Sequence, residues 1–326
     1  MSYIAIAVIA YFLVALEVIL DKFLLTSKRV SHPAIYAFYS GLLTSFVFFM
    51  VPFSFHQMSL YYALLSLLTG MIFTYGILSL FFAINKSEAS RVMPVVGAVI
   101  PIMTFVLSVA FLAERLRNVQ LVGVLALILG GLLISFDFPL KNKKKFFLGF
   151  ELSIVAGILL GIEVTLFKYL SDYYTFANVF IWTRWGVTLG ALSLLIIPSW
   201  RKVIMNSFGS FRHSKKEHHQ TGGLFILNKI LGGAGSILTK KAITLGSATI
   251  VSALVSTEYV FILLIGLIMS FQLPKIFQEK ETFLDITQKV VSILIISLGV
   301  FLISKNADFN LFYFIGHIYN QLINQI

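Results

Sequence analysis

Long apolar segments, separated by polar breaks, run through most of the chain. Crossing a bilayer core of about 30 Å takes about 20 helical residues. Segments of that length that are apolar on every side are typical of helices surrounded by lipid and by one another. The pattern predicts an all-α membrane protein with about ten transmembrane helices, near residues 3–25, 33–53, 59–84, 89–112, 118–136, 146–170, 175–198, 223–245, 247–271 and 286–304.

The segments between the predicted helices are polar or charged. The longest, residues 200–221, is rich in basic residues and histidine, and we expect a solvated loop. Residues 306–326 mix aromatic and polar side chains, so we expect an interfacial C-terminal tail there. The first predicted helix follows Met1 and Ser2 with no basic stretch before it and no cleavage site after it, so we expect a retained span.

Composition supports the membrane class and excludes others. Of the 326 residues, 58% are hydrophobic and 12% are charged, against about 25% charged in soluble proteins. The lack of cysteine excludes disulfides and thiol chemistry. The net charge of +11 lies mostly in short loops, as in an oriented membrane protein rather than a nucleic-acid-binding one. We expect a multi-pass protein of a bacterial or archaeal plasma membrane, with no nucleic-acid partner and no cofactor.

The chain also repeats itself. Residues 16–24 align with residues 162–170 at an offset of 146, which pairs Glu17 with Glu163. Further along, the offset grows to 159 and then to 168, and it changes in loops, where insertions are tolerated. The alignment predicts two five-helix repeats, residues 1–140 and 141–305, followed by the tail 306–326. Because five is odd, the second repeat enters the membrane inverted.

A set of residues around the fourth and fifth predicted helices occurs in a characteristic order. It consists of Pro101-Ile102, Glu114-Arg115-Leu116, Gln120, Gly123 and Gly130-Gly131. This order resembles the EamA signature of the drug/metabolite transporter superfamily, which reads roughly Pro-Val, Gly-Glu-Arg-Leu, then Gln and Gly. In the second repeat, residues 256–261 are similar to the family's Glu-Pro-Val-Phe stretch, with Tyr259 in place of the proline.

The resemblance implies a carrier of small metabolites with ten helices in two inverted halves. It also implies cytoplasmic termini, whereas the loop charges favour the opposite orientation. Five alternate loops carry 15 Lys and Arg residues and the other side about 6, which places both termini outside the cytoplasm. Inverted repeats of this kind bind their substrate between the halves, near the middle of the bilayer.

Charged residues inside the predicted helices are the candidate binding groups. A charge near the bilayer centre costs about 2.5–3.5 kcal/mol on insertion scales, so each one requires a reason. Glu17 and Glu163 occupy equivalent places in the two repeats and are candidates for facing one cavity and exchanging a proton. The structural alternative is that they neutralise basic neighbours.

Arg184, flanked by Trp182 and Trp185, is the cation placed deepest in a predicted helix. Its guanidinium could clamp a carboxylate or phosphate, with the tryptophans stacking on a ring or sugar. The alternative is a structural ion pair with Glu163 or Glu258.

Lys240 and Lys241 lie near the end of a predicted helix, where lysines commonly extend to the interface. The functional alternative is an anion site, with Glu258 as a partner for one of the lysines.

These observations predict a secondary transporter that moves a small polar or charged metabolite by alternating access, with a proton or counter-solute as a possible second partner. No Walker loop and no His-Glu-x-x-His motif is present, so we expect neither an ATPase nor an enzyme. A lipid or lipid-linked sugar translocase is the alternative within transport. A non-transporting membrane protein and an intramembrane enzyme rank lower.

Overall fold

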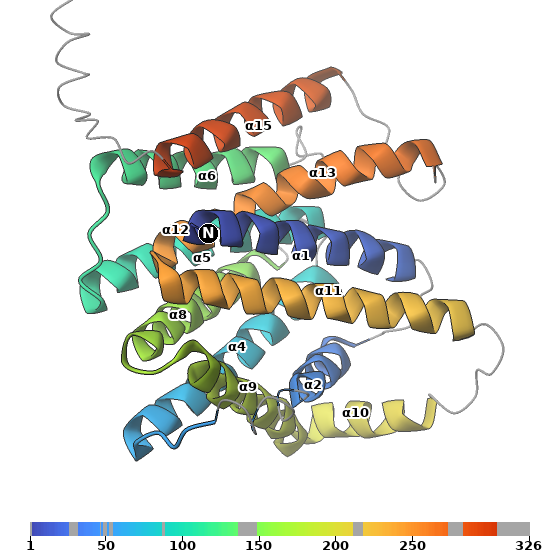
Figure 1. The fold of residues 1–326 in the computed structure, drawn as a ribbon. Helices are drawn as coiled ribbons and strands as arrows, with labels where there is room; N and C mark the ends of the chain where they lie inside the picture. The colour runs from blue at the N-terminus through green and yellow to red at the C-terminus, as the bar shows by residue number, and fades with distance from the viewer. Residues whose placement is uncertain are drawn as a thin grey trace, which may run out of the picture.

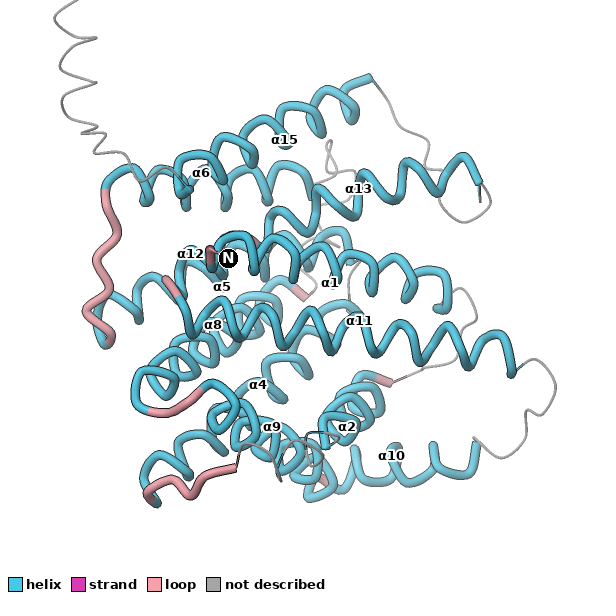
Figure 2. The backbone as a smooth tube through the Cα atoms, in the orientation of Figure 1, coloured by secondary structure: helices cyan, strands magenta, loops and turns pink. Residues whose placement is uncertain are grey.

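The computed structural model describes residues 2–25, 32–45, 47, 51, 55–86, 89–135, 149–210, 218–272 and 283–304. Helices joined by short loops make up the described residues, and no strand occurs among them (Figures 1 and 2). The helices are α1 (Tyr3–Leu25), α2 (Pro33–Leu43), α4 (Leu60–Lys86), α5 (Ala89–Phe111), α6 (Asn118–Ser135), α8 (Phe150–Tyr173), α9 (Phe176–Ser193), η2 (Leu194–Ile196), α10 (Pro198–Ser210), α11 (His218–Leu245), α12 (Ala248–Ala253), α13 (Val255–Gln272) and α15 (Phe283–Ser304).

Seven helical segments in the described part of the chain are long and apolar enough to cross a membrane. They lie in α1, α4, α5, α8, α9 with η2, α12 with α13, and α15, and α6 is apolar but shorter. Their lengths of 18 to 27 residues match a bilayer core. The fold is therefore that of an all-helical, multi-pass membrane protein. The full set of ten spans in two repeats stays a prediction, and the tail 306–326 lies outside the described residues.

Three details differ from the expected helices. The helix expected over 33–53 ends at Leu43 as α2, and part of the segment after it lies outside the described residues. The segment expected to be one helix over 247–271 is broken at Leu254, between α12 and α13. The region expected to be a loop over 200–221 contains α10, whose Trp200, Ile204 and Ser207 turn toward the bundle. Ile204 is fully buried, and the Ser207 hydroxyl lies 3.0 Å from that of Tyr39. Trp200, Ile204 and Ser207 are spaced by four and three residues, so they share one face of α10. This face packs against α2.

Contacts between helices that are far apart in sequence hold the bundle together. α1 lies along α11, α4 packs on α8 and α9, and α6 packs on α15 (Figure 1). α4 and α9 approach backbone to backbone at Gly70 and Gly186, where neither position has room for a side chain. Small residues permit such close crossings in membrane helices.

Several chain connections gather at one end of the bundle, on the left of Figure 1. These are the start of α1, the α5–α6 loop, the α8–α9 turn and the α11–α12 link. At this end Gly246 lies against the ring of Tyr3, and Gly123 near the start of α6 lies against Ile303 near the end of α15. The start of α1 and the end of α15 therefore lie at the same end of the bundle.

Candidate functional site

Polar and small residues form a line along one face of α11. Lys229, Gly232, Ser236 and Lys240 are spaced by three and four residues, so the helical period places them on one side. α11 packs on α1, α8 and α9, and each of these helices brings a charged side chain to the line. We call these four residues the α11 stripe.

Glu163 from α8 and Lys240 from α11 form a buried ion pair. Both carboxylate oxygens of Glu163 lie 2.6 Å from Lys240 Nζ. Only 6% of the Glu163 side chain and 9% of the Lys240 side chain are exposed. The Lys240 ammonium also lies 4.8 Å from the centre of the Phe167 ring. Lys240 therefore points into the protein, which excludes its expected role as a lysine extending to the interface.

Arg184 from α9 reaches the same stripe one turn away from this pair. One guanidinium nitrogen, Nη2, donates to Ser236 Oγ at 2.8 Å. The guanidinium carbon lies 4.6 Å from the centre of the Phe180 ring and 5.7 Å from that of Phe73, both cation–π distances. Arg184 interacts electrostatically with Glu163, but it has no ion-pair partner among the described residues.

Glu17 from α1 contacts the opposite end of the stripe. Its Oε1 lies 3.5 Å from Lys229 Nζ, and the two side chains are 22% and 32% exposed. The carboxylate lies directly against Gly232, since a Cβ placed there would overlap both of its oxygens. Glu17 and Glu163, expected to face a shared site, thus contact the same face of α11 about three turns apart.

Glu258, in the first turn of α13, is 6% exposed and lies close to α1. Glu17 is within electrostatic reach of its carboxyl group, as is the phenol of Tyr11. No hydrogen-bond or ion-pair partner for it occurs in the described part of the chain. Neither Lys240 nor Lys241, the lysines considered as its partners in the alternative of an anion site, pairs with it.

The remaining expected site residues lie apart from the stripe. Trp182 and Trp185 pack on Phe55, with ring centres 5.6 and 5.4 Å from its ring. Arg184 therefore stacks on phenylalanines rather than on the tryptophans that flank it in sequence. Lys241 points to the ring of Phe176, 5.1 Å from its centre.

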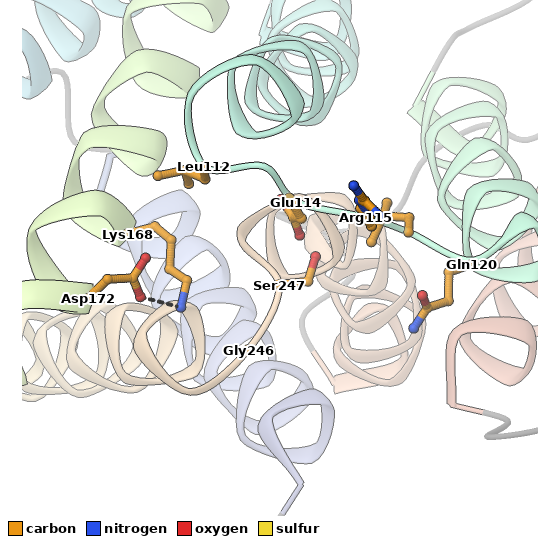
Figure 3. Close-up of a pocket in the computed structure, with 9 residues that line it drawn as sticks. Leu112, Glu114, Arg115, Gln120, Lys168, Asp172, Gly246 and Ser247 are labelled. Carbon is orange, nitrogen blue, oxygen red and sulfur yellow. Dashed lines mark ion pairs between the residues drawn. The ribbon is translucent and has the colours of Figure 1, made fainter.

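A pocket of about 300 Å³ opens at the end of the bundle where the connections gather (Figure 3). Lys168 and Asp172 form an ion pair of 3.0 Å on one side of it. Gly246 of the pocket directly follows the end of α11 and lies six residues after Lys240, a rise of about 9 Å at helical spacing. The pocket is lined by Leu112, Glu114, Arg115, Leu116, Gln120, Lys168, Asp172, Gly246 and Ser247.

The pocket wall includes four residues of the signature noted in the sequence, Glu114, Arg115, Leu116 and Gln120. Glu114 Oε2 accepts a hydrogen bond of 2.9 Å from Thr249 Oγ1, which ties the α5–α6 loop to α12. Ala113 before it has a φ of 51°, a left-handed conformation unusual for a residue with a side chain. The backbone N–H of Glu114 turns back to the Ser108 carbonyl at 3.1 Å. The strained turn thus directs the signature glutamate toward the second half of the chain.

Sequence reasoning did not identify Ser236 or the pairing role of Lys229. The signal that could have found them is the spacing of polar residues along α11, which repeats every three or four positions. Within the described residues, no group of three or more His, Asp or Glu side chains is placed to hold a metal ion.

The fold and site are those of a multi-pass helical membrane protein with a charged site in its interior. Residues 1–136 match the EamA-like transporter family, which confirms the resemblance found in the sequence. The first 136 residues are thus similar to EamA-like transporters, which belong to the drug/metabolite transporter superfamily. No curated protein matches it significantly. One solved structure, titled only as the crystal structure of a protein, has 13% sequence identity and a TM-score of 0.64, covering 94% of this chain and 99% of its own; it shares the fold.

Proposed function

We propose that this protein is a secondary carrier of a small metabolite with an anionic group, which Arg184 binds. The family match supports transport as the general activity. The observation that carries the anionic class is the buried guanidinium of Arg184, which has no acidic partner within ion-pair distance among the described residues.

Within the described part of the chain, the Arg184 guanidinium donates one hydrogen bond, to Ser236. A guanidinium has five N–H donors in a planar fork that fits a carboxylate or a phosphate. Here one hydroxyl, that of Ser236, accepts from it. The other donors are thus available for a bidentate contact with an anion, which is among the stronger hydrogen-bonding arrangements in proteins.

The charge balance around Arg184 also favours an anion. Both oxygens of Glu163 accept from Lys240, so that pair is neutral as a unit. Arg184 then leaves one positive charge in this buried group of three. Because such a charge is costly at membrane depth, a bound anion would offset the cost of keeping it there.

In this proposal the pocket is the entrance for the metabolite at one end of the bundle. It lies fewer than two helical turns from the Glu163–Lys240 pair along α11. In the proposed cycle a metabolite enters the pocket, the Glu163–Lys240 contact opens, and the anionic group reaches Arg184. The site then opens to the other side as the two halves rock against each other.

The arrangement of helices supports two inverted halves. In the proposed repeat α1 corresponds to α8 and α4 to α11, so the contact of α1 with α11 has its counterpart in that of α8 with α4. Both contacts are extensive in the structure. The gathering of alternate connections at one end also fits spans that cross in alternating directions (Figure 1). The bacterial or archaeal plasma membrane stays a prediction from the sequence.

The experiment has a binding arm and a transport arm. Purified protein is melted with inorganic phosphate, sugar phosphates, mono- and dicarboxylates, amino acids and neutral sugars. An anion that raises the melting temperature is then radiolabelled for uptake into proteoliposomes. Arg184→Ala is expected to abolish both responses, whereas Arg201→Ala, which removes an exposed arginine on α10, should leave them intact.

Three results would contradict the proposal. They are stabilisation by neutral sugars alone, unchanged uptake by the Arg184→Ala protein, and stabilisation confined to long-chain phospholipids. The last would favour the lipid translocase instead.

A further inference from the structure

Glu258 differs from the other carboxylates inside the bundle. Glu163 pairs with Lys240, Glu17 contacts Lys229, and Glu114 accepts from a threonine hydroxyl. Glu258 is 6% exposed. It has no such partner among the described residues. It also lies four residues after the break at Leu254, a type of discontinuity that occurs at the binding sites of transporters.

The polar groups nearest to Glu258 are already engaged. The Tyr11 hydroxyl donates to the Val251 carbonyl at 2.9 Å, and the Tyr259 hydroxyl donates to the Met93 carbonyl at 3.3 Å. Neither phenol proton is therefore available to stabilise an ionised Glu258.

Among the side chains that the structure describes, the helices packed against α13 bring no ion-pair partner to Glu258. α13 packs on α1, α6, α12 and α15, and its Tyr259 also reaches Met93 and Gly97 on α5, whose Arg91 side chain lies outside the described ones. α1 contributes Tyr11 and Glu17, and α6 and α12 contain no titratable side chain. On α15, Asp285 and Lys289 flank Gln288, whose amide donates to the carbonyl of Leu133 in the last turns of α6.

Glu258 belongs to a group of charged side chains beside α1. Glu17 and Glu258 interact with each other, and Lys229 contacts Glu17, which makes a group of three charged side chains. With both carboxyl groups ionised, this group has one negative charge too many, and two like charges repel in a medium that screens them poorly. One bound proton makes the group neutral.

We propose that Glu258 is a proton-binding site that couples this carrier to the proton gradient through Glu17 and Lys229. The inference rests on the proposed function, because coupling has meaning only if the chain transports a solute. With the proton bound, Glu17 keeps its contact with Lys229. When the proton leaves, Glu258 and Glu17 repel, and α1 is pushed away from α13.

Two features make the proton exchangeable. The Glu17 and Lys229 side chains are 22% and 32% exposed, so this pair is the more accessible end of the group. Glu258 lies in the first turn of α13, where the helix dipole stabilises a negative charge, so the ionised form is accessible during the cycle.

The proton also suits the substrate class. Moving one elementary charge across a membrane costs about 2.3 kcal/mol per 100 mV. A monovalent anion at Arg184 and a proton at Glu258 together carry no net charge. Import of the anion together with a proton is then independent of an opposing membrane potential.

The proton is detected first without any substrate. Infrared spectra of the purified protein at neutral pH should contain the carbonyl stretch of a protonated carboxyl group. Glu258→Gln should remove this band, and Glu151→Gln, which changes an exposed glutamate on α8, should retain it. The proposal is overturned if wild-type protein lacks the band or if the band survives in the Glu258→Gln protein.

A second measurement keeps the test valid if that variant does not fold. Dicyclohexylcarbodiimide reacts with protonated carboxyl groups in apolar surroundings, and mass spectrometry of peptides locates the adduct. Labelling of wild-type protein at Glu258 supports the inference, and labelling at Glu17 or Glu163 alone overturns it.

Transport separates this inference from the proposed function. Proteoliposomes are given an inward proton gradient, and uptake of inorganic phosphate and of each stabilising anion is measured. Wild-type uptake should rise with the gradient, and Glu258→Gln uptake should stay at its value without one. A proton band in a protein that transports none of these anions would refute the carrier alone. Uptake that depends on the gradient equally in both proteins would refute the proton site alone.

Discussion

Breaking the Glu163–Lys240 pair from one side should destabilise the protein strongly, and the two sides should not be equivalent. Both side chains are less than a tenth exposed, and their charged atoms are 2.6 Å apart. Removing one partner of such a pair leaves a buried charge without its counter-ion, which typically costs about 3–5 kcal/mol. Glu163→Gln should reach this range because it leaves Lys240 and Arg184 as two neighbouring cations.

Lys240→Met should cost less. Arg184 interacts electrostatically with Glu163 and has unused donors, so it can take over as the partner of the carboxylate. The double variant Glu163→Gln, Lys240→Met removes both charges. Its free energy of unfolding should lie within about 1 kcal/mol of the wild-type value or exceed that value, since replacing a buried pair as a whole is often neutral or stabilising.

The free energies of unfolding can be measured by circular dichroism during titration of dodecylmaltoside micelles with dodecyl sulfate. Lys168→Met is the matched control, because it breaks an ion pair with the 46% exposed Asp172 and should cost less than about 1 kcal/mol. The reasoning is refuted if Lys240→Met costs as much as Glu163→Gln, or if the double variant costs the sum of the two.

Three further substitutions test contacts in the same way. Gly232→Ala places a methyl group against the Glu17 carboxylate and should lower the free energy of unfolding by about 1–3 kcal/mol. The added methyl group of Gly233→Ala meets nothing, so this control should be neutral, and equal effects of the two substitutions would contradict the contact. Gly70→Ala forces a methyl group into the backbone of α9 and should cost about 3 kcal/mol or more, a value that a stable, well-folded variant in thermal melts would exclude. Tyr11→Phe removes the hydrogen bond to a backbone carbonyl on α12 and should cost about 1 kcal/mol in the same titration; no loss would show that the bond does not contribute.

The positions of most helices could be predicted from the sequence because lipid imposes a simple rule. A span must be apolar and about 20 residues long, and polar residues mark its ends. The expected segments 89–112 and 118–136 accordingly lie within one residue of α5 and α6 at each end. The rule does not detect a local break, so the interruption at Leu254 was not expected. It also ignores short amphipathic helices, and α10 was therefore taken for a loop.

The candidate site was predictable residue by residue but not as an arrangement. Glu163 and Arg184 could be identified from the sequence alone because each is a charged residue inside a long apolar segment. Their partners, Lys240 and Ser236, are 77 and 52 residues away in sequence, and helix packing brings them together. Lys240 lies close to a helix end, where an interfacial position was the simpler interpretation. Only the crossing of α8 with α11 shows that it points inward.

The proposed function requires that a solute entering from one end of the bundle reaches Arg184 and Ser236, at the α11 stripe. The chain contains no cysteine, so single cysteines can be introduced without background. Ser236→Cys, at the stripe, should react with a membrane-impermeant methanethiosulfonate, and a stabilising anion should slow the reaction. Ile237→Cys, on the neighbouring, outward-facing position that is 37% exposed, should stay unreactive in the bilayer. An unreactive Ser236→Cys together with a reactive Ile237→Cys would contradict the account.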